Sequence, residues 1–290
     1  MFREPRIFSF TPLMRDQLQK AADSHKYLHG HAVVVTGGAG RTGAARLAAR
    51  GALRVGAGLV TLAVPDEAVT EVDCQITSLM MCPMTSIADL DRLLDDQRLT
   101  AVCLGPGLGL GQKQTDMVAT VLADARPTVL DADALTLIAN NAAVMAALHP
   151  ACVLTPHEGE FARLFPDLAD DLSNANEIPA RADVLRLAAA RVGCTVLLKG
   201  PATLIADHKA QIWVHPRAAD GTLSWLATAG SGDVLAGFCL GLLARGLTPQ
   251  LATNLAVHLH RSAALRFGPG LIAEDLPEQV PALFREIGLS

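Results

Sequence analysis

The strongest constraint on the fold of this 290-residue chain is an alternation of short apolar runs with alanine-rich stretches. Runs such as Ala-Val-Val-Val at 32–35 have apolar residues at consecutive positions, so they predict strands that are buried on both faces. Expected strands cover residues 31–36, 58–64, 100–104, 128–131, 151–154, 195–198, 203–206 and 211–214. Expected helices cover residues 42–55, 88–96, 112–123, 133–148, 157–164, 180–191, 232–245 and 249–266.

Strand–helix alternation of this kind predicts a three-layer α/β/α sandwich around a mostly parallel sheet. The last two strands flank only residues 207–210, which is short enough for a hairpin, so an antiparallel piece is expected at one edge of the sheet. The polar segment 166–179 is expected to be a loop. Residues 1–23 are expected to form an N-terminal arm with a helix near 12–22, and residues 24–290 a single domain.

Composition excludes several classes of protein. Half of the residues are hydrophobic and only 18% are charged, which predicts a large core. A net charge of −5 and few aromatic residues do not suit nucleic-acid binding. The longest apolar stretch, 234–244, is shorter than the roughly 20 residues of a membrane span. The N-terminus does not resemble a signal peptide and no two cysteines have zinc-site spacing, so a reduced, cytoplasmic protein is expected.

Two glycine-rich segments precede expected helices, where free backbone N–H groups bind anions. Residues 38–43 read G-x-G-x-x-G after the first expected strand. This segment either contacts a ligand or forms a plain glycine turn. A dinucleotide site of the Rossmann type would use Asp66 or Glu67 as its acid.

The second segment, Gly230-Ser231-Gly232-Asp233, is the stronger signal. Its glycines open an anion hole at the start of the helix expected over 232–245. Asp233 either takes a proton from an attacking hydroxyl or merely complements the helix dipole, and spacing alone does not decide between them. Further along the helix, Gly237 and Gly241 share one face, which predicts close packing against another element.

This segment resembles the anion-hole and base motif of ribokinase-like small-molecule kinases. Six further sequence blocks narrow the resemblance to one family within that fold. They lie at 25–26, 43–45 with 57–60, 104–109, 130–135, 155–160 and 198–203. Together they resemble the ADP-dependent (S)-NAD(P)H-hydrate dehydratases, over residues 24–285. No epimerase domain is fused to the sequence, which is therefore expected to be a standalone dehydratase.

The resemblance implies a ribokinase-like fold and a cofactor-repair reaction. ADP would phosphorylate the ring hydroxyl of hydrated NADH or NADPH, and elimination of phosphate would restore the cofactor and leave AMP. Mg²⁺ would assist the phosphoryl transfer, although no protein metal ligands are predicted. The family also implies a homo-oligomer, namely a tetramer. The preference for NADH or NADPH, and for ADP or ATP, is not determined by the sequence.

The resemblance also assigns roles to individual residues. Asp233 would be the base and a substrate contact. The anion hole would comprise Gly230, Ser231 and Gly232, with Gly232 on the AMP phosphate. Further nucleotide contacts would come from Lys199, Gly200, Pro201, Ala202 and Thr203, and further substrate contacts from Ala44, Gly107 and His157.

Several of these blocks also have structural interpretations. Thr155, Pro156 and Glu158 have the spacing of a helix capping box, whereas no cap requires a histidine at 157. Asp131 either caps the next helix or reaches magnesium through water. Lys199 is otherwise a solvent-exposed charge at a strand end. His258 and His260 are two residues apart on one helix, so packing roles are expected rather than a metal pair.

The sequence departs from the family pattern at Tyr27 and in the segment 220–226, which is expected to reshape the loop over the site. Three other functions stay open. A thiazole or pyrimidine alcohol kinase would stop at the phosphorylated product. A Rossmann oxidoreductase would use Gly38, Gly40 and Gly43 but leave the second glycine segment unexplained. A catalytically silent nucleotide-binding protein would bind without turnover.

Overall fold

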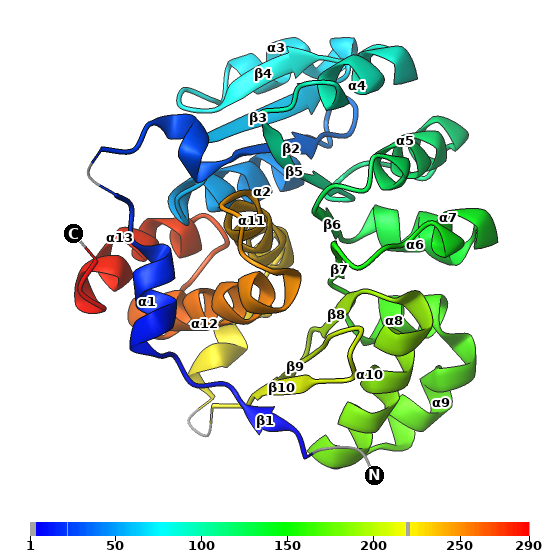
Figure 1. Ribbon diagram of the computed structural model, residues 1–290, viewed down its shortest axis with the longest axis vertical. Coiled ribbons are helices and arrows are strands. Elements are labelled where there is room, and N and C mark those ends of the chain that lie inside the picture. Colours follow the sequence, from blue (N-terminus) through cyan, green and yellow to red (C-terminus); the bar gives the residue numbers. More distant parts are fainter. Residues whose placement is uncertain (1–3, 22, 219–220, 290) are drawn as a thin grey trace.

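The computed structural model describes residues 4–21, 23–218 and 221–289. A single ten-stranded sheet crosses it, in the order β1-β10-β9-β8-β7-β6-β5-β2-β3-β4, with helices on both faces (Figure 1). The predicted three-layer α/β/α sandwich is therefore confirmed. The strands are β1 (Arg6–Ile7), β2 (His31–Val35), β3 (Leu59–Val64), β4 (Met80–Pro83), β5 (Leu99–Leu104), β6 (Thr128–Leu130), β7 (Cys152–Leu154), β8 (Thr195–Leu198), β9 (Thr203–Ala206) and β10 (Ile212–His215).

The sheet is parallel except where β9 runs antiparallel to both of its neighbours, β8 and β10. The predicted hairpin between β9 and β10 is therefore confirmed. Its turn is held by Asp207, whose carboxylate accepts the backbone N–H groups of Lys209 and Gln211 at 2.9 Å. Two edge strands were not predicted, because β1 is only two residues long and β4 is largely exposed and ends in Pro83.

The helices form two layers that share the sheet. One layer contains α1 (Pro12–Leu18), α2 (Gly43–Arg54), α3 (Val69–Asp73), α11 (Ser231–Ala244), α12 (Pro249–Phe267) and α13 (Asp275–Glu286). The other contains α4 (Ile87–Leu94), α5 (Gln112–Ala123), α6 (Asp133–Ala139), α7 (Ala142–Ala146), α8 (Glu158–Leu164), α9 (Pro166–Asn174) and α10 (Ile178–Val192). Short 3₁₀ helices are η1 (Lys26–His29), η2 (Asp66–Ala68) and η3 (Thr222–Leu226). None of the described helices is long and apolar enough to cross a bilayer.

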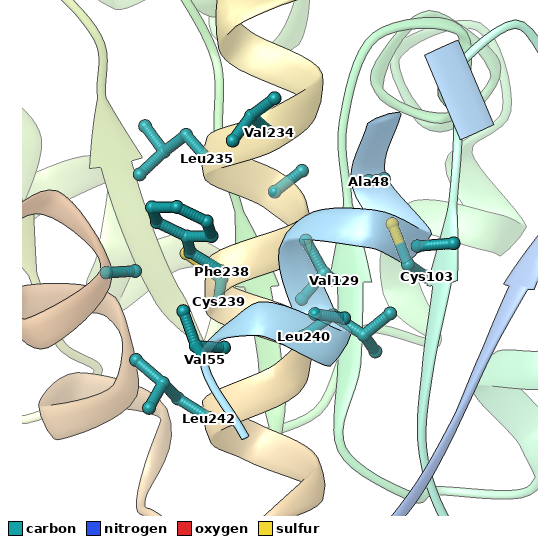
Figure 2. Packing of buried hydrophobic residues seen from close by; sticks show 14 of the residues in the cluster. Ala48, Val55, Cys103, Val129, Val234, Leu235, Phe238, Cys239, Leu240 and Leu242 are labelled. Atoms are coloured by element: carbon teal, nitrogen blue, oxygen red, sulfur yellow. The ribbon is translucent and has the colours of Figure 1, made fainter. Parts of the chain in front are cut away.

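The strand side chains alternate between two cores, one for each helix layer. On β2, Ala32 and Val34 face one core while Val33 and Val35 face the other. All four are fully buried, which is why the sequence shows a continuous apolar run instead of an alternating one. Figure 2 shows the first core, where Phe238 and Leu242 of α11 pack beside α2.

The close packing predicted for the α11 glycines is present. A Cβ atom on Gly237 would lie 2.0 Å from the carbonyl oxygen of Ala48, and one on Gly241 would lie 2.4 Å from that of Ala52. Only glycine permits this approach of α11 to α2. The contact anchors the start of α11 relative to the start of α2.

Two sequence predictions about helices were wrong, and one long helix was missed. Residues 166–179 are not a loop, because Leu168 and Leu172, four positions apart, bury one face of α9. The helix predicted over 133–148 is two helices, α6 and α7, and Asn141 caps the second by accepting two backbone N–H groups. Finally, α13 was not predicted, since its two prolines, Pro277 and Pro281, conceal its apolar face.

Candidate active site

The candidate site lies where β5, β6 and β8 end and α11 begins. The ladder of β7 and β8 continues past both strands as a parallel bridge between His157 and Lys199, and the Lys199 N–H donates to the Pro156 carbonyl at 2.8 Å. Topology thus brings together residues that are 42 positions apart in sequence. Ligands bind at this end of open parallel sheets.

The predicted anion hole is a helix N-terminus with an open turn before it. Gly230 has φ +86° and precedes α11, and a Cβ there would lie 2.6 Å from Leu47 Cδ1 and 2.8 Å from the Ala273 Cβ. Ser231 is held from behind by buried His260, whose Nε2 donates to the Ser231 carbonyl at 2.9 Å. Burial lowers the pKa of His260 to about 4, so the ring is neutral and serves as a fixed donor.

Asp233 occupies the first turn of α11, where three other carboxylates and one lysine affect its pKa. Burial raises its pKa to about 6, and the nearby carboxylates of Asp131, Glu160 and Asp133 add to the shift, while Lys199 opposes it. A carboxylate with a pKa near neutrality is well matched to accepting a proton from a hydroxyl. The helix dipole alone would stabilise the charged form and lower the pKa. The raised pKa has the direction that a base would need.

Lys199 is the cation at the centre of this group. Its Nζ donates to Asp131 Oδ1 at 2.8 Å and lies 3.7 Å from Glu160 Oε2. Burial acts to lower the pKa of Lys199, but attraction to Asp131 and Glu160 outweighs it and leaves the pKa raised. Lys199 is therefore a partly buried, charged side chain that is 21% exposed, and not a freely solvated charge at a strand end. A Cβ on Gly232 would lie 3.4 Å from Nζ, which places the lysine against the anion hole.

A capping box is present at the start of α8, but it is formed by His157 and Glu160 and not by the predicted Thr155 and Glu158. The N-cap of α8 is His157, whose Nδ1 accepts the N–H groups of Gly159 and Glu160 at 2.9 and 3.3 Å. The Glu160 carboxylate accepts the His157 N–H in return at 2.8 Å. The expectation that His157 has no capping role is therefore wrong. Its Nδ1 accepts backbone N–H groups in the same way as the side-chain oxygen of an asparagine cap. Its Nε2 lies 3.6 Å from Glu160 Oε1, and the ring is 55% exposed.

The segment after β5 approaches the start of α2. Gly107 has φ +67°, and a Cβ there would lie 2.3 Å from the Arg41 carbonyl oxygen and 3.8 Å from the Ala44 Cβ. Ala44 and Gly107 are therefore neighbours. Asp133 holds this segment from the other side by accepting the Gly109 N–H at 2.7 Å.

Ala132 has a backbone conformation that alanine rarely adopts, with φ +46° and ψ −117°. It separates Asp131, which is 1% exposed, from Asp133. Strained residues of this kind concentrate at functional sites. Here the strain aims one carboxylate at Lys199 and the other at the Gly109 N–H.

A cavity of about 560 Å³ opens between the Lys199 segment, η3 and the start of α11. Its cations are Lys199, Arg217 and Arg261, and its apolar wall includes Leu223 and Leu235. Cations beside an apolar wall suit a phosphorylated nucleoside. The predicted residues that line it are His157, Lys199, Gly200, Pro201, Thr203, Ser231 and Gly232.

Five predicted site residues lie outside that cavity lining. Asp233 and Gly230 border it, next to the lining residues Gly232 and Ser231, whereas Ala44 and Gly107 form their own contact further along α2. Ala202 packs against the core of the opposite layer. Sequence reasoning missed Glu160, Arg217 and Arg261, whose only signal was a charge. It considered Asp133 only as a helix cap and His260 only as a surface or packing residue.

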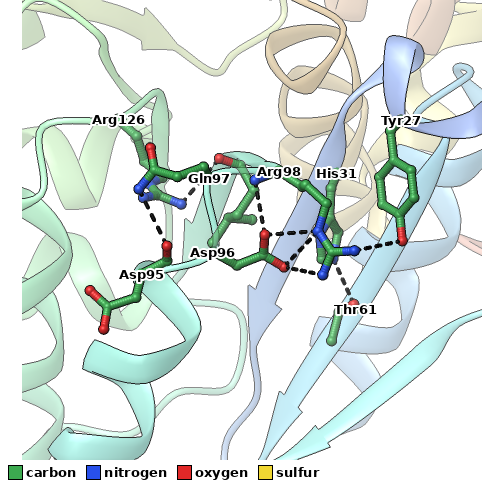
Figure 3. A network of polar contacts seen from close by, with 9 residues as sticks. Tyr27, His31, Thr61, Asp95, Asp96, Gln97, Arg98 and Arg126 are labelled. Atoms are coloured by element: carbon green, nitrogen blue, oxygen red, sulfur yellow. Dashed lines mark hydrogen bonds and ion pairs between the residues drawn. The ribbon is translucent and has the colours of Figure 1, made fainter.

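Tyr27 does not reshape the loop over the site, contrary to expectation. It lies on η1, before β2, at the opposite end of that strand from the candidate site. Arg98 Nη1 donates to its hydroxyl at 3.3 Å, and Asp96 holds the same guanidinium (Figure 3). The other segment that departs from the family pattern, 220–226, does line the cavity, through Leu223, Ser224 and Leu226 of η3.

The glycine-rich loop at 37–43 already holds an anion from its own chain. The Glu71 carboxylate accepts the Gly40 N–H at 2.6 Å and the Thr42 hydroxyl. These hydrogen bonds lower the pKa of Glu71. The acid that hydrogen-bonds to the loop is thus on α3. Glu67, one of the two acids that the dinucleotide fingerprint would use, also lies beside the loop, since a Cβ on Gly38 would lie 3.0 Å from Glu67 Oε1.

Two comparisons with known sequences agree on one family. The sequence model described as NAD(P)H-hydrate dehydratase matches residues 32–279. The bifunctional NAD(P)H-hydrate repair enzyme of Moorella thermoacetica is 36% identical over 288 residues, covering 94% of this chain and 53% of that protein. The ADP-dependent (S)-NAD(P)H-hydrate dehydratase of Neisseria meningitidis is 35% identical over 251 residues, covering 84% and 79%. The chain spans about half the length of the bifunctional relatives it matches.

Solved structures show the same fold. The ADP/ATP-dependent NAD(P)H-hydrate dehydratase from Bacillus subtilis, co-crystallized with ATP and Mg²⁺, is 27% identical with a TM-score of 0.76, covering 94% of this chain and 96% of that one. A ribokinase-like superfamily protein from Enterococcus faecalis is 22% identical with a TM-score of 0.80, covering 100% and 99%. The predicted ribokinase-like fold is confirmed, and the chain belongs to the NAD(P)H-hydrate dehydratase family.

Proposed function

We propose that this protein is a carbon–oxygen lyase that dehydrates the S form of hydrated NADH or NADPH at the expense of ADP. Family membership supports this proposal. The single structural observation that carries it is Asp233, a carboxylate with a pKa near 6 at a helix N-terminus beside Lys199. A base next to a phosphate-binding cation is what phosphoryl transfer to a hydroxyl requires.

The first step transfers a phosphoryl group to the hydrated ring. Asp233 takes the proton of the ring hydroxyl, whose oxygen forms a bond to the β-phosphorus of ADP. The bond between that phosphorus and the bridging oxygen breaks, and AMP leaves. Gly230, Ser231 and Gly232 offer backbone N–H groups to the phosphate, and Lys199 offers positive charge.

The second step eliminates inorganic phosphate. The ring C–O bond breaks and its electron pair leaves with the phosphate. The neighbouring carbon gives a proton to water, and the C–H electron pair forms the ring double bond of NADH or NADPH. The nucleotide segment from Lys199 to Thr203 is proposed to hold ADP in the cavity. Ala44, Gly107 and His157 are proposed to hold the hydrated cofactor, with the His157 ring fixed by its role as the α8 cap.

Magnesium fits this site only as an ion that binds together with the nucleotide, through its phosphate groups. Among the described residues no group of three His, Cys, Asp or Glu side chains could hold a metal ion. Mg²⁺ commonly uses one or two carboxylates together with substrate phosphates and water. Asp131 and Asp133 are the carboxylates available for this, and the ion would neutralise phosphate charge.

The alternative, an alcohol kinase of the same fold, differs in its products. Phosphorus NMR of a reaction with ADP, Mg²⁺ and hydrated NADH distinguishes the two. We expect AMP and inorganic phosphate in equal amounts, with no lasting phosphorylated ring. Accumulation of a phosphate monoester, or consumption of ADP without release of phosphate, would reject the dehydratase.

Three broader properties are also proposed. We infer that residues 24–290 form the catalytic domain, with residues 1–23 as an arm that adds β1 to the sheet. A cytoplasmic location suits a repair enzyme for soluble cofactors. A homo-tetramer is proposed from the family resemblance, and light scattering should report about four times the 30.4 kDa chain mass.

A further inference from the structure

A second cavity, of about 680 Å³, lies between α2, α13 and the segment that joins α3 to β4. We call it the α2–α13 groove. Its charged wall is a row of Arg46, Arg50 and Arg54, each one helical turn after the last, with one acid, Glu274, also in the lining. Its apolar wall includes Ile76 and Phe284. The function proposed above makes no use of these residues.

Arg46 differs from the other two arginines of the row. Glu278 pairs with Arg50 at 2.8 Å and with Arg54 at 2.5 Å, which neutralises part of their charge. Arg46 forms no ion pair with any residue that the structure describes, although the Glu71 carboxylate lies near enough for the Arg46 charge to help lower its pKa. Arg46 Nη1 donates to Gln75 Oε1 at 3.2 Å, and its Nε is buried with no hydrogen-bond partner. Because the Nε atom is enclosed by protein, an anion in the groove would meet the terminal Nη groups of the Arg46 guanidinium, which lines the groove.

The groove adjoins the candidate active site. Gly43 lines the groove and directly precedes Ala44, a proposed substrate contact. Leu47 also lines the groove, and its Cδ1 lies against Gly230 of the anion hole. One side chain thus separates the two. The twelve residues of α2 extend about 18 Å at 1.5 Å per residue.

We propose that the α2–α13 groove receives the adenosine-phosphate part of the hydrated dinucleotide, with Arg46 contacting one of its phosphate groups. A guanidinium matches phosphate geometry, and the apolar wall suits an adenine ring. Two phosphate groups have this chemistry, the bridging pyrophosphate and the 2′-phosphate that only NADPH carries. The inference rests on the function proposed above, because it assumes a dinucleotide substrate.

Calorimetric titration with NAD⁺ and NADP⁺ tests the proposal, since neither carries the reacting hydroxyl. The variants are Arg46→Gln, Arg46→Lys and a control, Arg92→Gln, which removes a 74% exposed arginine on the opposite helix layer. Arg46→Gln should weaken binding at least tenfold, Arg46→Lys should retain part of the affinity, and the control should match the wild type. Loss for both ligands identifies the pyrophosphate, and loss for NADP⁺ alone identifies the 2′-phosphate.

Unchanged affinity for both dinucleotides in Arg46→Gln would overturn the proposal, as would a wild type that binds neither. ADP, assigned to the Lys199 cavity, should bind all four proteins equally; a parallel loss of ADP affinity in Arg46→Gln would also overturn it. These titrations need no turnover. Binding that depends on Arg46 without dehydration would reject the proposed function alone, and dehydration without dependence on Arg46 would reject the groove alone.

Discussion

At the scale of single residues, the account depends on the protonation of Asp233. Its pKa of about 6 means that the carboxylate is mostly protonated at pH 5 and mostly charged at pH 7. Burial is the main cause, and the neighbouring Asp131, Glu160 and Asp133 make a further negative charge less favourable. These three neighbours come from other segments, so spacing within the motif did not reveal the shift.

The first prediction concerns the pH dependence of kcat/KM, which reports groups of the free enzyme. Because the base must be charged, kcat/KM should rise about tenfold per pH unit below pH 6 and level off above it. Glu160→Gln should move the midpoint downward, since it removes one of the charges that raise the pKa. The exposed control Asp167→Asn should leave it unchanged. A profile that is flat between pH 5 and 8 would contradict the role of Asp233.

The second prediction concerns the effect of the raised Asp233 pKa on the stability of the fold at different pH values. The folded pKa lies above the ordinary aspartate value of 3.8, so the folded state binds the proton more tightly and loses stability as the pH rises from about 4 to 6. Asp233→Asn removes this loss. Thermal unfolding should therefore show a higher Tm than wild type at pH 8 and little difference at pH 4. A lower Tm at pH 8 would show that the charged form stabilises the fold.

At the scale of elements, the packing of α11 on α2 fixes the anion hole relative to Ala44. The third prediction is that Gly237→Ala lowers the free energy of unfolding by about 1–3 kcal/mol through overpacking against Ala48. Alanine would otherwise favour a helix by about 1 kcal/mol. Gly43→Ala is the control, since its Cβ would meet nothing closer than 3.9 Å. Denaturant unfolding measures both, and equal stability of the two variants would contradict the close approach.

The fourth prediction separates the two roles of His157. His157→Ala should cost about 1 kcal/mol as a lost cap, whereas His157→Asn should keep the cap, because its side-chain oxygen can accept the Gly159 N–H. Both variants lose the exposed ring and should raise KM for the hydrated cofactor. Chemical unfolding and steady-state kinetics measure the two effects. If His157→Asn kept both stability and KM, the ring would not be a substrate contact.

At the scale of the whole molecule, the sequence predicted the layered fold well because buried parallel strands have a plain signature. Eight of the ten strands were expected, and the hairpin between β9 and β10 was placed correctly. The elements that were missed lack such a pattern. In α9 the buried stripe is only Leu168 and Leu172 among acids, and in β1 two residues pair at the sheet edge.

The candidate site was less predictable, because its chemistry arises from contacts between distant segments. The ion pair of Asp131 with Lys199 spans 68 positions, and Glu160 completes the group from a third element. The strained backbone at Ala132 could not be predicted, because alanine is common in this sequence and does not indicate a positive φ. The α2–α13 groove likewise depends on which arginine Glu278 pairs with, and only coordinates show that.

The central claim is that this chain converts hydrated NADH to NADH with ADP, using Asp233 as the base. The most direct test mixes the purified protein with hydrated NADH, ADP and Mg²⁺ and follows the near-ultraviolet absorbance of NADH. We predict recovery of the absorbance by the wild type and at least a hundredfold slower recovery by Asp233→Asn, the low end for loss of a general base. No recovery by the wild type with ADP or ATP, or equal rates for both proteins, would contradict the account.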